Sequence, residues 1–98
     1  MYCLVTNYQT NDKNFDQVIN LFQNQAIPLV AKQPGFKGVY FMTKTTGELM
    51  LLNIWDTEQQ ATAWAQDSEQ QKISAQLMPL LIGAPARDGY QISASVVP

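Results

Sequence analysis

The chain has 98 residues, of which 46% are hydrophobic and 10% aromatic, so it is long enough for one globular domain and too short for two. Its formal charge of -2 comes with six scattered Lys and Arg residues, which argues against nucleic acid or an anionic membrane as a partner. A single cysteine, Cys3, excludes an intramolecular disulfide and favours the cytoplasm, and no stretch approaches the roughly 20 apolar residues of a membrane span.

Histidine is absent from the chain. It is the commonest metal ligand and the usual general base near neutral pH, so its absence argues against zinc sites, non-haem iron sites and hydrolytic triads. We therefore expect no metal, and any catalysis has to use other polar side chains or the substrate itself.

The first predicted element is a β-strand over residues 2–8. Successive side chains of a strand point to opposite faces. One face of this strand carries Cys3, Val5 and Asn7, and the other carries Tyr2, Leu4, Thr6 and Tyr8.

An amphipathic helix is predicted over residues 15–30, where apolar side chains recur at helical spacing. Asn14 followed by Gln17 has the spacing of a capping box. Pro28 lies inside this helix, lacks an amide donor and crowds the carbonyl of Asn24, so we expect a kink.

A β-hairpin is predicted within residues 33–57. Pro34-Gly35 ends the preceding helix, and residues 44–48 form the turn, with Gly47 in a left-handed conformation. A strand that is apolar on both faces must be covered on both sides. The second strand of the hairpin is such a strand, because Leu49, Leu51 and Trp55 alternate with Met50, Leu52 and Ile54.

A second helix is predicted after the hairpin, with capping signatures at Thr57–Gln60 and Ser68–Gln71. Its buried stripe includes Trp64, and at the second signature the helix either restarts or continues until Pro79. Residues 90–97 alternate between apolar and polar side chains, which predicts a last strand with one buried face.

The predicted order is therefore β-α-β-β-α-β. This is the α+β ferredoxin-like arrangement, a four-stranded antiparallel sheet with two helices on one face. The helices cover one face of the sheet, yet the strand over residues 49–55 is apolar on both. Two sheets packed face to face across a two-fold axis resolve this conflict, so we predict a homodimer through the open sheet face.

The chain resembles the antibiotic biosynthesis monooxygenase-like domains of the dimeric α/β-barrel superfamily. The resemblance is carried by Pro34-Gly35-Phe36, by Leu52-Asn53-Ile54-Trp55-Asp56-Thr57 and by Trp64, and it suggests one such domain over residues 1–98. It implies a small dimer whose pocket lies between the sheet and its own helices.

Better-understood members of this superfamily use the pocket in two ways. One group oxidises aromatic polyketide-like substrates with dioxygen and without metal or flavin, because the substrate reduces oxygen as an electron-rich carbanion. The other group binds and degrades haem with an Asn, a Trp and a His. Asn7 and Trp64 match the first two positions, but the histidine position falls near Ser74, so haem degradation is disfavoured.

Asn7, Asn53 and Trp64 are the candidate catalytic residues. An amide orients a substrate carbonyl or stabilises an enolate, and an indole stacks on a flat ligand. The simpler alternatives are amides satisfied by the backbone and a Trp in the core.

The candidate substrate-binding residues are Tyr8, Tyr40, Trp55 and Arg87. The tyrosines can donate to a substrate oxygen, and Trp55 supplies an aromatic wall beside Asn53. The alternatives are tyrosine hydroxyls in water, a Trp55 in the dimer interface, and a solvated loop pair at Arg87-Asp88.

The sequence supports two functions of different classes. The first is a cofactor-independent monooxygenase that oxidises a small aromatic or quinol-like substrate with dioxygen. The alternative is a non-catalytic dimer that binds a small ligand or takes part in a stress response. The sequence does not decide between an enzyme and a binding protein.

Overall fold

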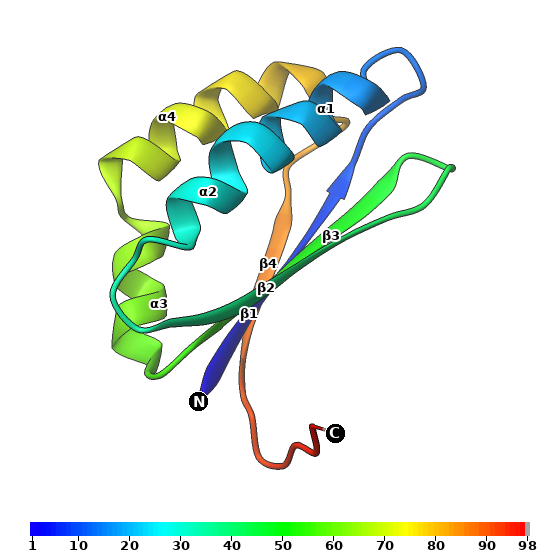
Figure 1. Cartoon of the computed structure of the whole chain (residues 1–98). Helices are drawn as coiled ribbons and strands as arrows, with labels where there is room; N and C mark the ends of the chain where they lie inside the picture. The colour runs from blue at the N-terminus through cyan, green and yellow to red at the C-terminus, as the bar shows by residue number, and fades with distance from the viewer. Residues whose placement is uncertain (98) are drawn as a thin grey trace.

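The computed structural model describes residues 1–97 and contains one four-stranded antiparallel sheet with helices on one face (Figure 1). The strand order is β2-β3-β1-β4, so β3 and β1 are central and β2 and β4 are the edges. The strands are β1 (Tyr2–Gln9), β2 (Phe36–Thr43), β3 (Glu48–Trp55) and β4 (Ala86–Gln91). The predicted ferredoxin-like α+β fold is confirmed.

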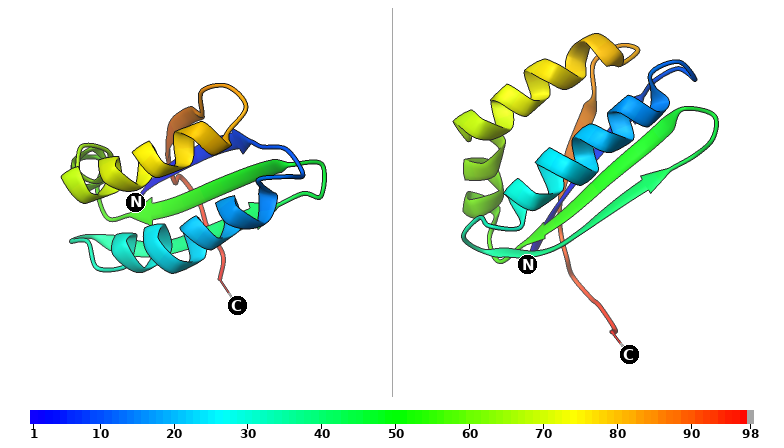
Figure 2. Two further views of the ribbon diagram at one scale, coloured as in Figure 1. Left: turned by 90° about the horizontal axis from the view of Figure 1, so that it is seen from above. Right: turned by 45° about the horizontal axis from the view of Figure 1, so that its top comes forward.

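The helices form a single layer over the sheet (Figure 2). The helical elements are α1 (Phe15–Leu21), η1 (Phe22–Ala26), α2 (Ile27–Val30), α3 (Glu58–Ala65), α4 (Ser68–Leu77) and η2 (Met78–Leu80). The first three form one continuous run, whereas α3 and α4 are separate helices, so the second helix restarts after the second capping signature, one of the two predicted alternatives. Within residues 1–97, no helix has the length and apolar character needed to cross a membrane.

The register of β1 against its two neighbours determines which side chains share a face. Thr6 pairs with Leu51 of β3 on one side and with Arg87 of β4 on the other. Residues paired in this way point to the same face of a sheet. These three side chains point to the helices, and Asn7, the next residue in β1, points to the open face.

The core lies between the helices and the sheet and is built on alternate residues of β3. One cluster packs Leu49 and Leu51 against α1, η1 and α4. A second cluster packs Trp55 against Trp64 of α3. Trp55 has no exposed surface (0%), so its indole is enclosed by the protein's own core.

The opposite face of the sheet has no helix over it (Figure 1). Val5, Leu52 and Ile54 are half-buried on this face, and Tyr40 and Met42 are exposed. The prediction that β3 is apolar on both faces is confirmed, and within residues 1–97 only one face is covered. The second copy that would cover the open face stays a prediction.

The first helical run is irregular next to Pro28, as predicted, but the irregularity is a π-helical segment. The N–H of Ile27 donates to the carbonyl of Phe22, five residues earlier. Because Pro28 has no N–H and its ring crowds the carbonyl of Asn24, a wider turn before it accommodates the ring.

The helix caps agree with the sequence only in part. Thr57 accepts from the N–H of Gln60 at 3.2 Å, as predicted. Asn14 makes no side-chain cap, so the predicted capping box at α1 is wrong. The cap of α4 is Asp67 rather than Ser68, because the carboxylate accepts from two N–H groups of the first turn.

The last strand begins earlier than predicted and ends at Gln91, whereas the alternation continues through residues 90–97. In the observed register Gln91 pairs with Tyr2, at the start of β1. The described chain therefore offers residues 93–97 no neighbouring strand. The alternation of apolar and polar residues requires an apolar surface on one side, and the described part of this protomer does not provide one.

The turn between β2 and β3 depends on Gly47, which has the predicted left-handed conformation with φ at +92°. A Cβ at this position would meet the carbonyl oxygen of Thr10. The N–H of Thr10 in turn donates to the carbonyl of Gly47 at 2.9 Å, so the two backbones are locked together. Gly83 also has a positive φ, +75°, but a Cβ there meets only open space.

We expect Gly47→Ala to destabilise the protein more than Gly83→Ala. Both variants incur about 1–2 kcal/mol for an alanine in the left-handed region. Gly47→Ala adds about 1–3 kcal/mol because the Thr10 backbone has to move. Urea unfolding of both variants measures the difference, and equal losses of unfolding free energy would contradict the proposed backbone contact.

Candidate functional site

A narrow recess of about 30 Å³ lies between the sheet and the helices. It shares Thr6, Tyr8, Ser74, Leu77 and Arg87 with an outer cavity of about 250 Å³. Because five residues line both spaces, we treat them as one site, the sheet-helix cavity, with an inner recess and an outer part. The resemblance implied a pocket in this position.

Asn53 of β3 lies at the inner recess and is 2% exposed. Its Oδ1 accepts a hydrogen bond from Nε1 of Trp55 at 2.7 Å. An indole N–H only donates, so this bond sets the orientation of the amide. No hydrogen bond from Nδ2 of Asn53 to a protein acceptor is found within residues 1–97, so the amide nitrogen is available as a donor.

Trp64 of α3 forms an aromatic wall of the inner recess. It is almost completely buried, and the centroid of its ring lies 6.3 Å from that of Trp55. Trp64 therefore belongs to the core and also lines the cavity, so both interpretations of this residue describe part of its environment.

The positive charge of the cavity comes from Arg87 of β4, whose Nε donates to Oγ1 of Thr6 at 3.4 Å. Tyr8 lies beside this pair. Burial raises the pKa of the Tyr8 hydroxyl, and the charge of Arg87 and interactions with Thr6 and Arg87 oppose that rise. Near neutral pH the Tyr8 hydroxyl is therefore protonated and can donate a hydrogen bond.

The lining of the sheet-helix cavity contains no Asp or Glu. Arg87 is its one charged side chain, so the local potential favours an anionic group. Donors on Asn53, Tyr8 and Arg87 suit a negatively charged oxygen, and the indole of Trp64 suits a flat ring. The arrangement is therefore suited to an aromatic anion.

Three polar lining residues, Thr6, Gln70 and Ser74, were not among the predicted site residues. Gln70 Nε2 donates to Ser74 Oγ at 3.2 Å, one turn further along α4, and Asp67 caps the same turn. Polar pairs at this spacing are common on solvated helix faces, so the spacing gives no signal that distinguishes a cavity.

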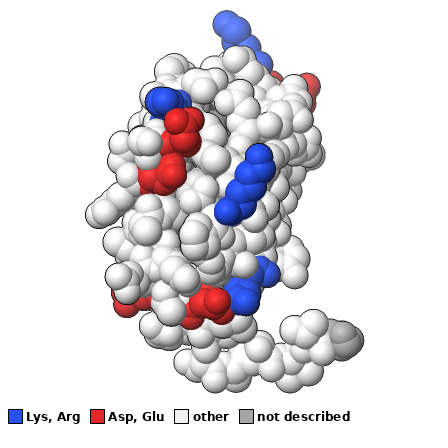
Figure 3. Space-filling model, turned by 60° about the vertical axis from the view of Figure 1, so that its left-hand side comes forward, with Lys and Arg blue, Asp and Glu red and all other residues white. Residues whose placement is uncertain are grey.

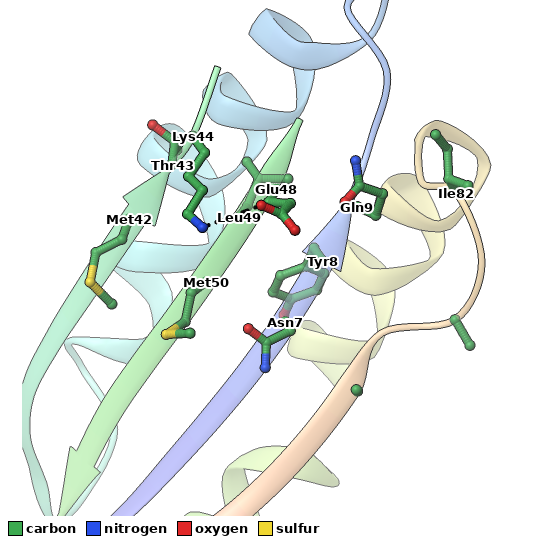
Figure 4. A pocket seen from close by; sticks show the side chains of 12 residues that line it. Asn7, Tyr8, Gln9, Met42, Thr43, Lys44, Glu48, Leu49, Met50 and Ile82 are labelled. Carbon is green, nitrogen blue, oxygen red and sulfur yellow. Dashed lines mark ion pairs between the residues drawn. The ribbon is translucent and has the colours of Figure 1, made fainter. Parts of the chain in front are cut away.

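Asn7 and Tyr40 do not lie in the sheet-helix cavity. Both are exposed on the open face, and Figure 4 shows Asn7 projecting there from β1 next to Met50 of β3. Successive residues of a strand point to opposite faces, so Asn7 points away from the face that carries Thr6 and Tyr8. The structure therefore does not bring Asn7 together with Asn53 and Trp64.

The structure contradicts one predicted alternative for Trp55 and one for Arg87. Trp55 lines neither part of the cavity and is buried under the helices, so its placement in a dimer interface is wrong. Arg87 and Asp88 are not a loop pair, because both lie in β4 and successive strand residues point to opposite faces. Arg87 lines the cavity and Trp55 holds Asn53 in place.

A larger hollow of about 580 Å³ lies on the open face, between the ends of the strands and the loop before β4 (Figure 4). Met42, Met50 and Ile82 contribute apolar surface to it. Lys44 and Glu48 form an exposed ion pair of 3.4 Å at its edge. We call it the open-face hollow and distinguish it from the sheet-helix cavity, because it lacks a tryptophan wall and lies on the other side of the sheet.

Charge and metal-binding groups add no other candidate site. No group of three or more His, Cys, Asp or Glu side chains within residues 1–97 is arranged to hold a metal ion. On the face shown in Figure 3 the charged side chains are scattered, with acidic and basic groups close together. Cys3 is buried, and burial raises the pKa of its thiol, as expected for a structural cysteine rather than a reactive one.

These features define a small ferredoxin-like domain with a histidine-free cavity between its sheet and its helices. The model of the antibiotic biosynthesis monooxygenase family matches residues 1–76, and the chain belongs to this family. No curated protein matches the chain.

Solved structures share this fold at low sequence identity. A monooxygenase from the gene ActVA-Orf6 of Streptomyces coelicolor, in complex with nanaomycin D, has a TM-score of 0.84 and 17% identity, covering 99% of this chain and 91% of that chain. SnoaB, a cofactor-independent oxygenase from Streptomyces nogalater, has a TM-score of 0.83 and 11% identity, covering 97% and 95%. A Nitrosomonas europaea protein of unknown function has a TM-score of 0.85 and 13% identity, covering 99% and 93%. At these identities the likeness shows the fold alone.

A double-mutant cycle tests the bond between Asn53 and Trp55. Asn53→Leu and Trp55→Phe each leave one buried partner without its hydrogen bond, which costs about 1–3 kcal/mol of unfolding free energy. The double variant should therefore lose about 1 kcal/mol less than the sum of the single losses. The matched cycle of Asn53→Leu with Trp64→Phe, which removes no hydrogen bond between the pair, should be closer to additive. Additive losses in the Asn53–Trp55 cycle would contradict the assigned amide orientation.

Proposed function

We propose that the chain is a cofactor-independent monooxygenase that oxidises a small aromatic or quinol-like substrate with dioxygen in the sheet-helix cavity. The observation that carries this proposal is the amide of Asn53, a residue that lines the recess and whose oxygen is occupied by Trp55, which leaves its nitrogen to donate. The nearby guanidinium of Arg87 and indole of Trp64 complete a site for an aromatic anion. Family membership and two structurally similar oxygenases support the reaction class.

In this proposal the substrate supplies the electrons. It loses a proton to water, because no carboxylate or histidine lines the cavity to accept one. Donors on Asn53 and Arg87 hold the oxygen on which the negative charge collects. The carbanion carbon bonds to dioxygen, the resulting peroxide takes up a proton, and loss of water leaves a new carbonyl group. One oxygen atom enters the product and the other leaves as water.

The dimensions of the cavity indicate how such a substrate would lie. The inner recess of about 30 Å³ matches the volume of about one water molecule. The reacting edge of the ring would therefore enter the recess beside Asn53, while the rest of the ring lies in the outer part beside Arg87. Tyr8, with its protonated hydroxyl, is placed to donate to a second substrate oxygen.

We also infer a homodimer packed through the open sheet face. Leu52 and Ile54 are half-buried on this face, and Tyr40 is 62% exposed. Large apolar side chains in a continuous exposed surface favour association with a second apolar surface. The single cysteine supports a location in the cytoplasm.

A second candidate function is a non-catalytic dimer that binds a small ligand. The narrowness of the inner recess favours it, because a ligand confined to the outer part, about 250 Å³, does not reach Asn53. Such a protein would be stabilised by aromatic anions without consuming oxygen.

Oxygen uptake is the measurement that separates the two functions. An oxygen electrode with dithranol, 1-naphthol and 1,4-naphthohydroquinone, no added cofactor and subtraction of the protein-free rate should show uptake by the wild-type protein. Asn53→Ala should reduce the rate roughly 100-fold, the usual effect of removing one donor to a developing anion. Trp64→Phe should reduce it as well, by weakening the stacking of the ring.

Asn24→Ala serves as the matched control, because Asn24 is an exposed residue of η1 away from the cavity. Its rate should equal that of the wild type. If Asn7→Ala removes uptake and Asn53→Ala does not, the reaction takes place at the open face and the assignment to the sheet-helix cavity is wrong. Thermal stabilisation by the same compounds without any uptake would instead establish the binding protein.

Leu52→Glu tests the dimer. A carboxylate at the centre of an apolar interface loses its hydration without a partner, so we expect a monomer in sedimentation velocity, with the circular dichroism of a folded protein. Ala63→Glu, which adds the same charge on the exposed side of α3, should leave the dimer intact. A stable dimer carrying Leu52→Glu would contradict packing through the open face.

A further inference from the structure

Two amide side chains from different layers line the inner recess of the sheet-helix cavity. Asn53 belongs to β3 of the sheet, and Gln70 belongs to the first turn of α4. Gln70 is half-buried at this position. The proposed reaction uses the amide of Asn53 and gives the amide of Gln70 no role.

The start of α4 holds Gln70 in place. Its backbone N–H donates to Oδ1 of Asp67, the cap of the helix, at 3.3 Å. Nε2 of its side chain donates to Oγ of Ser74, one turn further along the helix, at 3.2 Å. No hydrogen bond from a protein donor to Oε1 of Gln70 is found within residues 1–97, so the amide oxygen is available as an acceptor.

The two amides therefore offer complementary groups to one small space. Asn53 has its oxygen occupied by Trp55 and its nitrogen available to donate, whereas Gln70 has its nitrogen occupied and its oxygen available to accept. The recess of about 30 Å³ matches the volume of about one water molecule. A hydroxyl group satisfies both amides, because its oxygen accepts and its hydrogen donates. A carbonyl group only accepts, so it would leave Oε1 of Gln70 without a partner.

We infer that the recess recognises a neutral hydroxyl group of the substrate, and that Gln70 is the residue that distinguishes this hydroxyl from a carbonyl. The inference deepens the proposed function and rests on it for the site that the substrate occupies. It narrows the substrate class to ring compounds that enter the recess with a hydroxyl group, such as the reduced member of a hydroquinone–quinone pair. When this hydroxyl ionises, its oxygen keeps the hydrogen bond from Asn53.

The same pairing favours release of the product. In the proposed reaction the ionised oxygen becomes a carbonyl when the carbanion carbon bonds to dioxygen, so a quinone-like product has no hydrogen to donate to Gln70. An acceptor left without a partner costs free energy, and a site that pairs with a hydroxyl discriminates against an analogue that lacks it. A quinone should therefore bind more weakly than its hydroquinone, although the two have nearly the same size.

Anaerobic titration calorimetry measures this preference without turnover. The ligands are 2,3-dimethyl-1,4-naphthohydroquinone and the corresponding quinone, which differ by two hydrogen atoms. The wild-type protein should bind the hydroquinone with the lower Kd. Gln70→Met, which keeps the length of the side chain and removes the acceptor, should reduce the ratio of the quinone Kd to the hydroquinone Kd roughly tenfold, the effect of one unmade hydrogen bond.

Two further variants separate recognition from a structural role of Gln70. Gln71→Met is the matched control, because Gln71 is the next residue of α4 and is exposed, and it should keep the wild-type ratio. Gln70→Glu retains an acceptor oxygen and should retain the preference for the hydroquinone. A substitution that only loosened α4 would weaken both ligands equally and leave the ratio unchanged. An unchanged ratio in Gln70→Met therefore overturns the inference.

Oxygen uptake distinguishes a failure of this inference from a failure of the proposed function. Uptake by the wild-type protein together with an unchanged ratio in Gln70→Met overturns the role of Gln70 and leaves the oxygenase in place. A roughly tenfold change of the ratio without uptake overturns the oxygenase and supports hydroxyl recognition by a binding protein.

Discussion

The structure depends on a strand, β3, that runs through the middle of the sheet with apolar side chains on both faces. Its buried face, with Leu49, Leu51 and Trp55, packs against the helices and forms the core. Its other face carries apolar side chains without a layer over them. Full burial of one large apolar side chain is worth about 1.5–3 kcal/mol, so the open face represents an appreciable driving force for association. Fold and proposed assembly are therefore two consequences of one strand.

The polar exception on the buried face of β3 is Asn53. An unpaired amide in such a position costs a few kcal/mol, roughly 1–3 by mutational measurements. Trp55, two residues along the same face, satisfies the amide oxygen, and the amide nitrogen of this recess-lining residue remains available as a donor. The hydrogen bond that makes Asn53 tolerable in the core thus also determines which group it presents to a ligand. Stability and the proposed chemistry share this contact.

Much of the fold could be predicted because its signals are local. Alternation, turn glycines and helical spacing indicated the element order, the hairpin and both faces of β3. The end of β4 was missed because a strand ends where its neighbour ends, and Gln91 already pairs with Tyr2 at the start of β1. Asn53 and Trp64 were predicted as site residues and line the cavity, but Asn7 does not. Both faces of β1 mix apolar and polar residues, so only the pairing with β3 determines which face meets the helices.

The cavity constrains the chemistry more strongly than the fold does. With Arg87 as its one charged residue and no carboxylate or histidine, it can attract and hold an anion but offers no ordinary base. The neutral hydroxyl of Tyr8 strengthens this limit, because burial disfavours its ionised form. In the proposed reaction, a substrate of this site must therefore ionise readily and, because no cofactor takes part, carry its own reducing electrons. Hydroxylated aromatic compounds and quinols have both properties, whereas a substrate of low acidity would bind without reacting.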